Sequence, residues 1–266
     1  MKKILIIGII LLLTFLVILK LSKSSNNEFI KMNNKEITDT IKDINIDPVN
    51  HASLILAWED KVIYADPVNE GGKDLFASKP DADFILVTDI HQDHLDAETL
   101  EEVVREKTVI VVPKAVADQL PENLKSKTTI LNNGDEKEFG GFSIEAVPMY
   151  NLPGPSANYH TKGRGNGYVI ERGGLRVYIS GDTAGIPEMR SLKNIYIAFI
   201  CMNLPYTMSP EEAADAVLEF KPKVVYPYHY RQNPTKNFAD VAKFKEIINS
   251  NNTNIEVRQL DWYANT

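Results

Sequence analysis

Two histidines and three aspartates stand within eight residues, directly after an apolar segment of the chain. The segment Phe84–Thr88 is an expected strand, and it runs into Asp89-Ile90-His91-Gln92-Asp93-His94-Leu95-Asp96. Strand ends are where α/β folds place their binding sites. Imidazole and carboxylate groups are the ligands that zinc and related divalent ions prefer. The pattern therefore favours a turn that aims several metal ligands at one small volume over a solvated acidic turn.

The rest of the chain alternates short runs rich in valine and isoleucine with amphipathic stretches, which predicts an α/β fold. Gly173-Gly174 joins two apolar runs in the way typical of a β-hairpin. Ser209, followed by Pro210 and Glu212, is typical of a helix start. The expected strands are residues 53–58, 61–65, 84–88, 109–112, 128–131, 142–147, 167–171, 175–180, 195–202, 224–227 and 255–259. The expected helices are residues 97–105, 114–119, 210–220 and 237–249.

Two more residues of the ligand type follow expected strand ends downstream. Asp182 stands in Ser180-Gly181-Asp182-Thr183, and His229 stands in Tyr226-Pro227-Tyr228-His229-Tyr230. Either residue alone is a weak signal. Together with the x-His-x-Asp-His cluster, in this order, they form a specific signal for a metal site.

These motifs resemble the metallo-β-lactamase superfamily, whose metal motif reads His-x-His-x-Asp-His, followed by a mid-chain His, a Gly-Asp and a final His. The resemblance covers about residues 50–262 and includes Ala65-Asp66-Pro67. The stretches 167–183 and 203–208 look like the branch that contains the ascorbate-phosphate lactonase-like hydrolases. The resemblance implies an αββα four-layer sandwich with the site at one edge of the two sheets. It also implies that one metal is held by Asp93, His94 and His229, that His91 belongs to the other, and that Asp182 bridges them.

The chain departs from the family pattern at two ligand positions. Asp89 stands where the first motif histidine would be, and Asn151 stands near the place of the mid-chain histidine. Asp89 can ligate directly, and three aspartates with one bridging hydroxide would balance the four charges of two divalent cations. Because Asn151 is a weak ligand, His160 in the following loop is a candidate substitute. Further candidates for metal or substrate binding are His51, with a structural histidine as the alternative, and Asn203 and Tyr206, with loop packing as the alternative.

The predicted function is that of a metal-dependent hydrolase. Two divalent ions are expected, with zinc first and manganese or iron as alternatives favoured by the oxygen-rich ligands. A metal-activated hydroxide, oriented by Asp93, would cleave an ester, lactone, amide or phosphodiester bond in a small molecule. The alternatives are a non-catalytic metal-binding scaffold and a di-iron redox protein of the same fold. A formal net charge of -7 argues against nucleic acid as a partner, and the oligomeric state stays open.

The N-terminus has the pattern of a targeting or anchoring segment. Lys2 and Lys3 precede the apolar run Ile4–Leu19, and a polar stretch follows. We therefore expect an N-terminal apolar helix as a membrane anchor or signal segment, then a polar stalk, then the hydrolase domain, at residues 1–21, 22–46 and 47–266. The expected location is the membrane with the catalytic domain outside the cytoplasm, and secretion after signal cleavage is the alternative.

Overall fold

Two seven-stranded sheets form the centre of the computed structural model, which describes residues 39–232 and 237–264. The first sheet has its strands in chain order: β1 (Asp39–Ile41), β2 (Ile44–Asn50), β3 (Ser53–Trp58), β4 (Lys61–Ala65), β5 (Phe84–Leu86), β6 (Val109–Val112) and β7 (Thr128–Ile130). The second has them in reverse order: β14 (Glu256–Val257), β13 (Val224–Tyr228), β12 (Ile197–Cys201), β11 (Leu175–Ile179), β10 (Gly165–Arg172), β9 (Phe142–Met149) and β8 (Glu136–Phe139).

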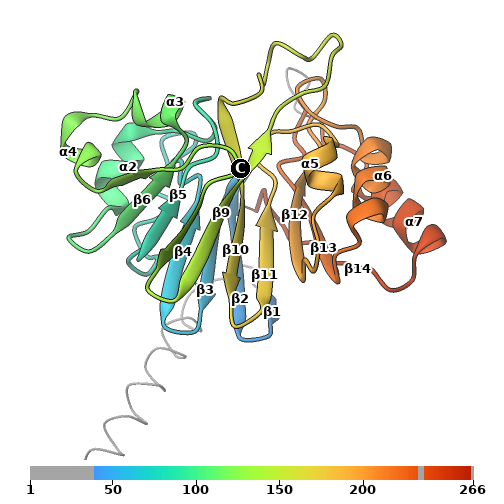
Figure 1. Ribbon diagram of the computed structural model, residues 1–266, viewed down its shortest axis with the longest axis horizontal. Helices are drawn as coiled ribbons and strands as arrows, with labels where there is room; N and C mark the ends of the chain where they lie inside the picture. Colours follow the sequence, from blue (N-terminus) through green and yellow to red (C-terminus); the bar gives the residue numbers. More distant parts are fainter. Residues whose placement is uncertain (1–38, 233–236, 265–266) are drawn as a thin grey trace, which may run out of the picture. The chain divides into compact units, whose positions relative to one another are not determined.

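Helices flank the two sheets on opposite sides (Figure 1). The first sheet is accompanied by α2 (Ala97–Val103), α3 (Lys114–Ala117) and α4 (Glu122–Lys125). The second sheet is accompanied by α5 (Pro187–Arg190), α6 (Pro210–Phe220) and α7 (Val241–Asn251). The predicted αββα sandwich is therefore confirmed for the described residues.

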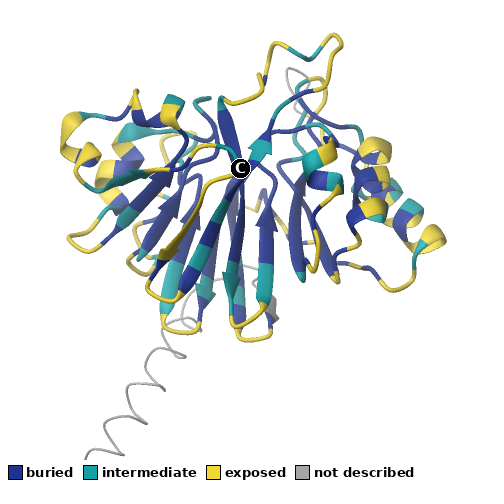
Figure 2. Ribbon diagram, in the orientation of Figure 1, coloured by how far each residue is buried: buried dark blue, intermediate teal, exposed yellow. Residues whose placement is uncertain are grey.

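The period of two in the strands explains this layering. In β3, Leu54 and Leu56 join the large core between the sheets, while Ile55 between them joins the smaller core under α2–α4. Successive side chains of a strand point to opposite faces, so an apolar strand must be covered on both. Trp58 of β3 meets Phe142 of β9 edge to face, with ring centroids 5.2 Å apart, across the layer between the sheets. Figure 2 shows the strands buried and the outer faces of the helices exposed.

Parallel pairing brings the functional strand ends to one edge. Strands β4 to β7 pair in parallel in the first sheet, and β11 to β14 pair in parallel in the second. All the carboxyl ends of parallel neighbours lie at the same edge of their sheet. The residues that follow β5, β11 and β13, which carry the predicted ligands, are therefore gathered from distant parts of the sequence.

Several boundaries differ from the prediction, for local reasons. The domain starts earlier than residue 47, because β1 and β2 form a hairpin through Lys42 and Asp43, whose φ angles of 52° and 66° suit a tight two-residue turn. Ile44 and Ile46 are buried, so the end of the predicted stalk belongs to the sheet. The predicted helix at 237–249 begins at Val241, because the Asp240 side chain caps it. The strand β8 was missed because it is a charged edge strand.

The predicted membrane location is corrected. Among the described residues, none of the helices is long and apolar enough to cross a bilayer. The segment 1–21, on which the membrane anchor and the signal segment were predicted, lies outside the described residues, as does the stalk up to residue 38. The described domain belongs to one compact unit of residues 37–266.

Candidate metal centre

The turn after β5 carries four of the predicted ligands. The chain leaves the sheet at Leu86, and the backbone N–H of His94 donates to the carbonyl of His91 at 2.9 Å. This turn places Asp93 and His94 just before α2, whose N-cap residue is Asp96. Local hydrogen bonding therefore presents the x-His-x-Asp-His motif as one unit.

Asp93, His94 and His229 converge on one point, and we call this group the Asp93 half. His94 Nε2 and His229 Nε2 face each other at 3.1 Å. His229 Nε2 also lies 3.3 Å from Asp93 Oδ2. Both imidazoles are fully buried. These three side chains come from two sheets, since His229 follows β13.

Asp89, His91 and His160 form a second group, which we call the Asp89 half. His91 Nδ1 lies 2.9 Å from Asp89 Oδ2, and His160 Nε2 lies 3.8 Å from the same oxygen. The three ligand atoms are close enough together to hold one ion. His160 is contributed by the loop between β9 and β10.

Asp182 lies between the two halves. Its Oδ2 is 3.5 Å from His94 Nε2 and 3.2 Å from His160 Nε2, while its Oδ1 is 3.4 Å from His229 Nε2. The preceding residue, Gly181, allows this position of Asp182. Its φ is +58°, and a Cβ atom there would lie 2.5 Å from Met149 Sδ. Only glycine fits this left-handed, crowded position. Steric crowding thus explains why a glycine precedes Asp182 in the sequence.

Burial and neighbouring charge set the ionisation of the site. Burial opposes ionisation of Asp182, yet His229 and His94 lower the pKa of its carboxyl well below the usual range. Burial, assisted by His229, lowers the pKa of His51 to about 4. At neutral pH Asp182 is therefore a carboxylate and His51 is neutral.

Buried partners orient the imidazoles of the Asp93 half. Asp66, at the end of β4, has its Oδ2 2.8 Å from His94 Nδ1 and also accepts from Thr88. Asn203 Nδ2 lies 2.9 Å from His229 Nδ1. A partner on the second ring nitrogen fixes the orientation of the imidazole. For His229 Nε2 to bind a metal, Nδ1 must carry the proton, which requires the Asn203 amide oxygen rather than its nitrogen to face Nδ1. Asn203, predicted as a metal or substrate residue, is thus placed against His229.

Arg164 is the main residue that sequence reasoning missed. Its Nε and Nη2 donate to the two carboxylate oxygens of Asp89 at 3.0 and 2.7 Å. Burial opposes ionisation of Asp89, but His91 and Arg164 hold the pKa of its carboxyl below the usual value. Arg164 also adds one positive charge to the neutral sum expected from the sequence. A buried carboxylate at the first motif position needs a cationic partner, and this need is the sequence signal that could have indicated Arg164.

The structure separates the two candidates for the mid-chain position. His160 reaches Asp182, whereas the amide of Asn151 donates to the carbonyls of Ser156 and Tyr206 at 2.8 and 2.7 Å. Asn151 Nδ2 also lies 3.2 Å from His160 Nδ1. Asn151 therefore holds the loop and the imidazole in place, and His160 is the residue that meets the cluster.

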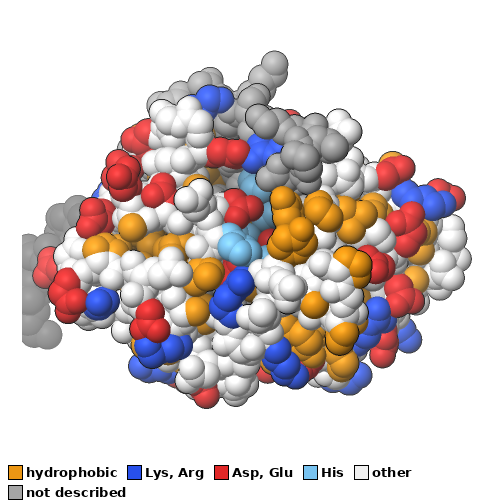
Figure 3. All heavy atoms as spheres, turned by 90° about the horizontal axis from the view of Figure 1, so that it is seen from above, with side chains coloured by type: hydrophobic (Ala, Val, Ile, Leu, Met, Phe, Trp, Pro, Cys, Tyr) orange, Lys and Arg blue, Asp and Glu red, His pale blue; other side chains and the backbone are white. Residues whose placement is uncertain are grey.

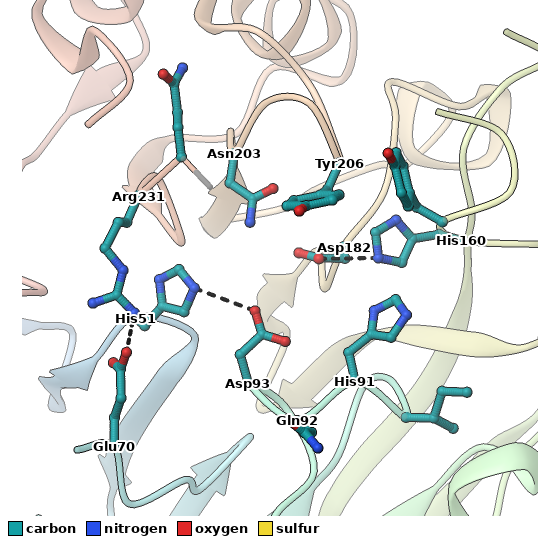
Figure 4. A pocket seen from close by; sticks show the side chains of 13 residues that line it. His51, Glu70, His91, Gln92, Asp93, His160, Asp182, Asn203, Tyr206 and Arg231 are labelled. Carbon is teal, nitrogen blue, oxygen red and sulfur yellow. Dashed lines mark hydrogen bonds and ion pairs between the residues drawn. The ribbon is translucent and has the colours of Figure 1, made fainter. Parts of the chain in front are cut away.

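A cavity of about 640 Å³ opens over the cluster. Figure 3 shows imidazole and acidic side chains in a hollow of this face, with an apolar area beside it. In Figure 4, Asp93 lies between His51 on one side and His91 on the other. Tyr206, predicted as a candidate, lines the cavity and packs edge to face on Tyr159 with centroids 4.7 Å apart. The cavity is lined by His51, Glu70, Ile90, His91, Gln92, Asp93, Tyr159, His160, Asp182, Asn203, Tyr206, Arg231 and Gln232.

The donor set fits divalent metal ions. His160 Nε2 and Asp182 Oδ1 are buried atoms that form no hydrogen bond among the described residues. Their nearest polar neighbours are other ligand atoms: His160 Nε2 lies 3.2 Å from Asp182 Oδ2, and Asp182 Oδ1 lies 3.4 Å from His229 Nε2. A cation among these atoms would satisfy both. The residues present are thus consistent with ions in both halves.

Comparison with known proteins gives a consistent picture. The family model described as "Beta-lactamase superfamily domain" matches residues 45–229. The UPF0173 metal-dependent hydrolase of Thermococcus onnurineus is 33% identical over 207 residues, which are 75% of this chain and 90% of that protein. The relative from Lysinibacillus sphaericus, with the same description, is 30% identical and covers 74% of this chain and 92% of its own length.

Solved structures with this fold include close and distant relatives. A predicted metal-dependent hydrolase from Parabacteroides distasonis superposes with a TM-score of 0.75 at 35% identity, over 85% of this chain and 99% of that one. Igni18, a metallo hydrolase from Ignicoccus hospitalis, has a TM-score of 0.67 at 21% identity, over 82% and 94% of the two chains. The second likeness supports the fold alone.

Proposed function

Because this chain belongs to the β-lactamase superfamily, we propose that it is a metal-dependent hydrolase that works with two divalent cations. The Asp93 half would hold one cation and the Asp89 half the other, with Asp182 between them. Zinc is the proposed ion, with manganese or iron as alternatives because carboxylates contribute strongly. The assignment is supported by the position of His94 and His229, which follow strands of different sheets and both lie near Asp182.

Bound divalent ions would lower the pKa of a coordinated water to about 7 and polarise the bond under attack. The chain supplies the positioning. Asp93 exposes 42% of its side chain to the cavity, whereas His94 beside it is fully buried. Its carboxylate can therefore face both the cluster and an attacking water, which supports Asp93 as the catalytic residue that orients the nucleophile.

The cavity supports a small molecule as the substrate. Its volume of about 640 Å³ lies in the range of small-ligand sites. The Tyr206 ring, which packs on that of Tyr159, offers an apolar surface, while Arg231, beside His51 and away from Tyr206, offers hydrogen-bond donors (Figure 4). We propose an ester, lactone, amide or phosphodiester as the bond that is cleaved, and the lactonase-like branch stays a prediction.

The observation that carries this proposal is the convergence of buried ligand atoms. Three imidazoles meet around Asp182, and His160 Nε2 and Asp182 Oδ1 form no hydrogen bond in the described part of the chain. Charged and polar atoms gathered in a buried place need a compensating group. Metal ions supply that compensation.

The test is metal analysis of the purified protein, followed by a panel of hydrolase substrates with added zinc and manganese. We expect two ions per chain and hydrolysis of at least one class of bond. Removal of the ions by a chelator should abolish activity, and their return should restore it. Gln92→Ala is a matched control for metal content only, because Gln92 is exposed in the same turn as the ligands but lines the proposed substrate cavity.

Two results would contradict the proposal. One tight ion with no hydrolysis would favour a non-catalytic metal-binding scaffold. Two iron atoms with a redox signal would favour a di-iron redox protein of the same fold.

A further inference from the structure

Tyr263 determines which nitrogen of His51 carries the proton. The Tyr263 hydroxyl oxygen accepts the backbone N–H groups of Tyr230 at 3.0 Å and Arg231 at 2.9 Å. A hydroxyl oxygen has two lone pairs, so these bonds use its acceptor capacity. His51 Nδ1 lies 2.9 Å from the same oxygen. An N–H at this nitrogen would be a third donor to one oxygen, so the geometry favours an unprotonated Nδ1 that accepts the hydroxyl proton of Tyr263.

The hydrogen of His51 is then on Nε2, the nitrogen that faces the cluster. In a neutral imidazole one nitrogen accepts and the other donates. His51 Nε2 lies 3.4 Å from Asp93 Oδ2, and the ring lines the cavity (Figure 4). A metal ligand must offer a lone pair without a proton. His51, Asp93 and His229 are close enough to hold an ion, but the Tyr263 contact makes His51 unsuitable as its ligand.

The backbone holds this ring in place. His51 has a left-handed φ of 50°, its N–H donates to the carbonyl of Trp262 at 3.1 Å, and its carbonyl accepts from His229 N–H at 3.2 Å. The imidazole also packs on that of His229, with centroids 3.9 Å apart. A donor that is oriented before the substrate arrives is more effective than one that must be ordered on binding.

We infer that His51 is a hydrogen-bond donor rather than a metal ligand, and that its Nε2–H binds an oxygen atom of the substrate beside the cleaved bond. The substrate part of this inference rests on the proposed hydrolase function. The neighbouring guanidinium of Arg231 is ion-paired with Glu70, so this side of the cavity offers donors with little net charge. The matching group is a polarised carbonyl or phosphoryl oxygen.

The direct test is the tautomer of His51, measured through the ring ¹⁵N signals of the full-length protein loaded with zinc. The chain has five histidines, and His51→Ala assigns the signal of interest. We expect a protonated Nε2 and an unprotonated Nδ1, neither bound to metal. Tyr263→Phe should shift the population towards the other tautomer. A proton on Nδ1, or a metal-bound Nε2, in the parent protein would overturn the inference.

Metal content and kinetics supply the second test. His51→Ala should keep both ions and lower kcat by about 100-fold. His51→Gln, which keeps an N–H near the position of Nε2, should recover part of this loss. Tyr263→Phe should lower kcat by about 10-fold. The matched control is Tyr178→Phe, because the buried Tyr178 hydroxyl forms no hydrogen bond in the described chain.

The outcomes separate this inference from the hydrolase proposal. Loss of an ion in His51→Ala makes His51 a ligand and overturns the inference. Unchanged kcat in an active enzyme overturns the substrate contact. A metal-loaded parent protein without any hydrolysis, but with the expected tautomer, overturns the hydrolase proposal and the substrate contact while it supports His51 as a donor.

Discussion

The Asp93 half and the Asp89 half of the cluster differ in how their ligand atoms are supported. In the Asp93 half, buried Asp66 and Asn203 orient the two imidazoles. Each half has one ligand whose side chain is about 40% exposed, Asp93 in the first and His91 in the second. In the Asp89 half, both carboxylate oxygens of Asp89 accept hydrogen bonds from Arg164. The halves therefore differ in their carboxylates: a guanidinium pairs with that of the Asp89 half, while the carboxylate of Asp93 faces the cavity.

This difference has an electrostatic consequence. Asp89 and Arg164 together carry no net charge, so the pair resembles a neutral histidine in the charge it brings to the cluster. The shared hydrogen bonds also draw electron density away from the Asp89 oxygens and weaken them as ligands. We therefore expect the ion of the Asp93 half to bind more tightly than that of the Asp89 half.

The largest effect is expected where the two halves meet. Asp182→Ala should remove ligand atoms from both halves at once, and metal analysis should find less than one ion per chain with hydrolysis at background level. His94→Ala should empty the Asp93 half and also abolish hydrolysis. Two ions retained in both variants would break the assignment of the cluster.

A chelator titration tests the order of affinities. We expect two steps of metal release, with the Asp89 half emptied at a chelator concentration about 10-fold or more below that needed for the other half. His91→Ala should abolish the first step and leave the second. Simultaneous loss of both ions in the parent protein would show that the halves are equally strong.

The ion pair of Arg164 with Asp89 makes it possible to test whether charge balance affects metal binding in the Asp89 half. Asp89→His alone leaves a guanidinium facing a cation without a carboxylate between them, so the ion of this half should bind about 10-fold more weakly. The double variant Asp89→His with Arg164→Gln keeps the net charge of the parent pair and should regain that affinity. Together with Arg164→Gln alone and the parent, these variants form a double-mutant cycle, read by competition with a metal-binding dye. Equal affinities in the single and double variants would show that Arg164 has no electrostatic role.

Effects confined to one half are expected from the groups that orient histidines. Asp66→Asn should weaken the ion of the Asp93 half by about 10- to 100-fold and leave the other half unchanged. Asn151→Ala should act on the Asp89 half instead, because Asn151 contacts His160. An effect of either variant on both halves alike would mean that the two sites are coupled more strongly than their separate partners suggest.

Most of the fold could be predicted because its signals are local. The period of two in β3 and the apolar runs of β10 and β11 predict strands with covered faces, and the Ser209 capping box predicts the start of α6. The missed elements lack such signals. Strand β8 is charged, and α4 is a single short turn after Pro121. The hairpin of β1 and β2 through Lys42 and Asp43 is hard to recognise in the sequence because polar residues surround it.

The sequence by itself determined the kinds of ligands and the order in which they occur. His91, Asp93 and His94 follow one expected strand within four residues, and Asp182 directly follows a glycine. These features are written in neighbouring residues, so family membership could be inferred from them, and the comparisons confirm it.

Tertiary structure alone decided which residues complete and support the cluster. Arg164 lies 75 positions from Asp89, and Tyr263 lies 212 positions from His51. No periodicity or spacing relates residues so far apart, because their contact arises only when two sheets pack face to face. The choice of His160 over Asn151 has the same origin: the path of one loop across the edge of the sheets determines which of the two side chains faces Asp182.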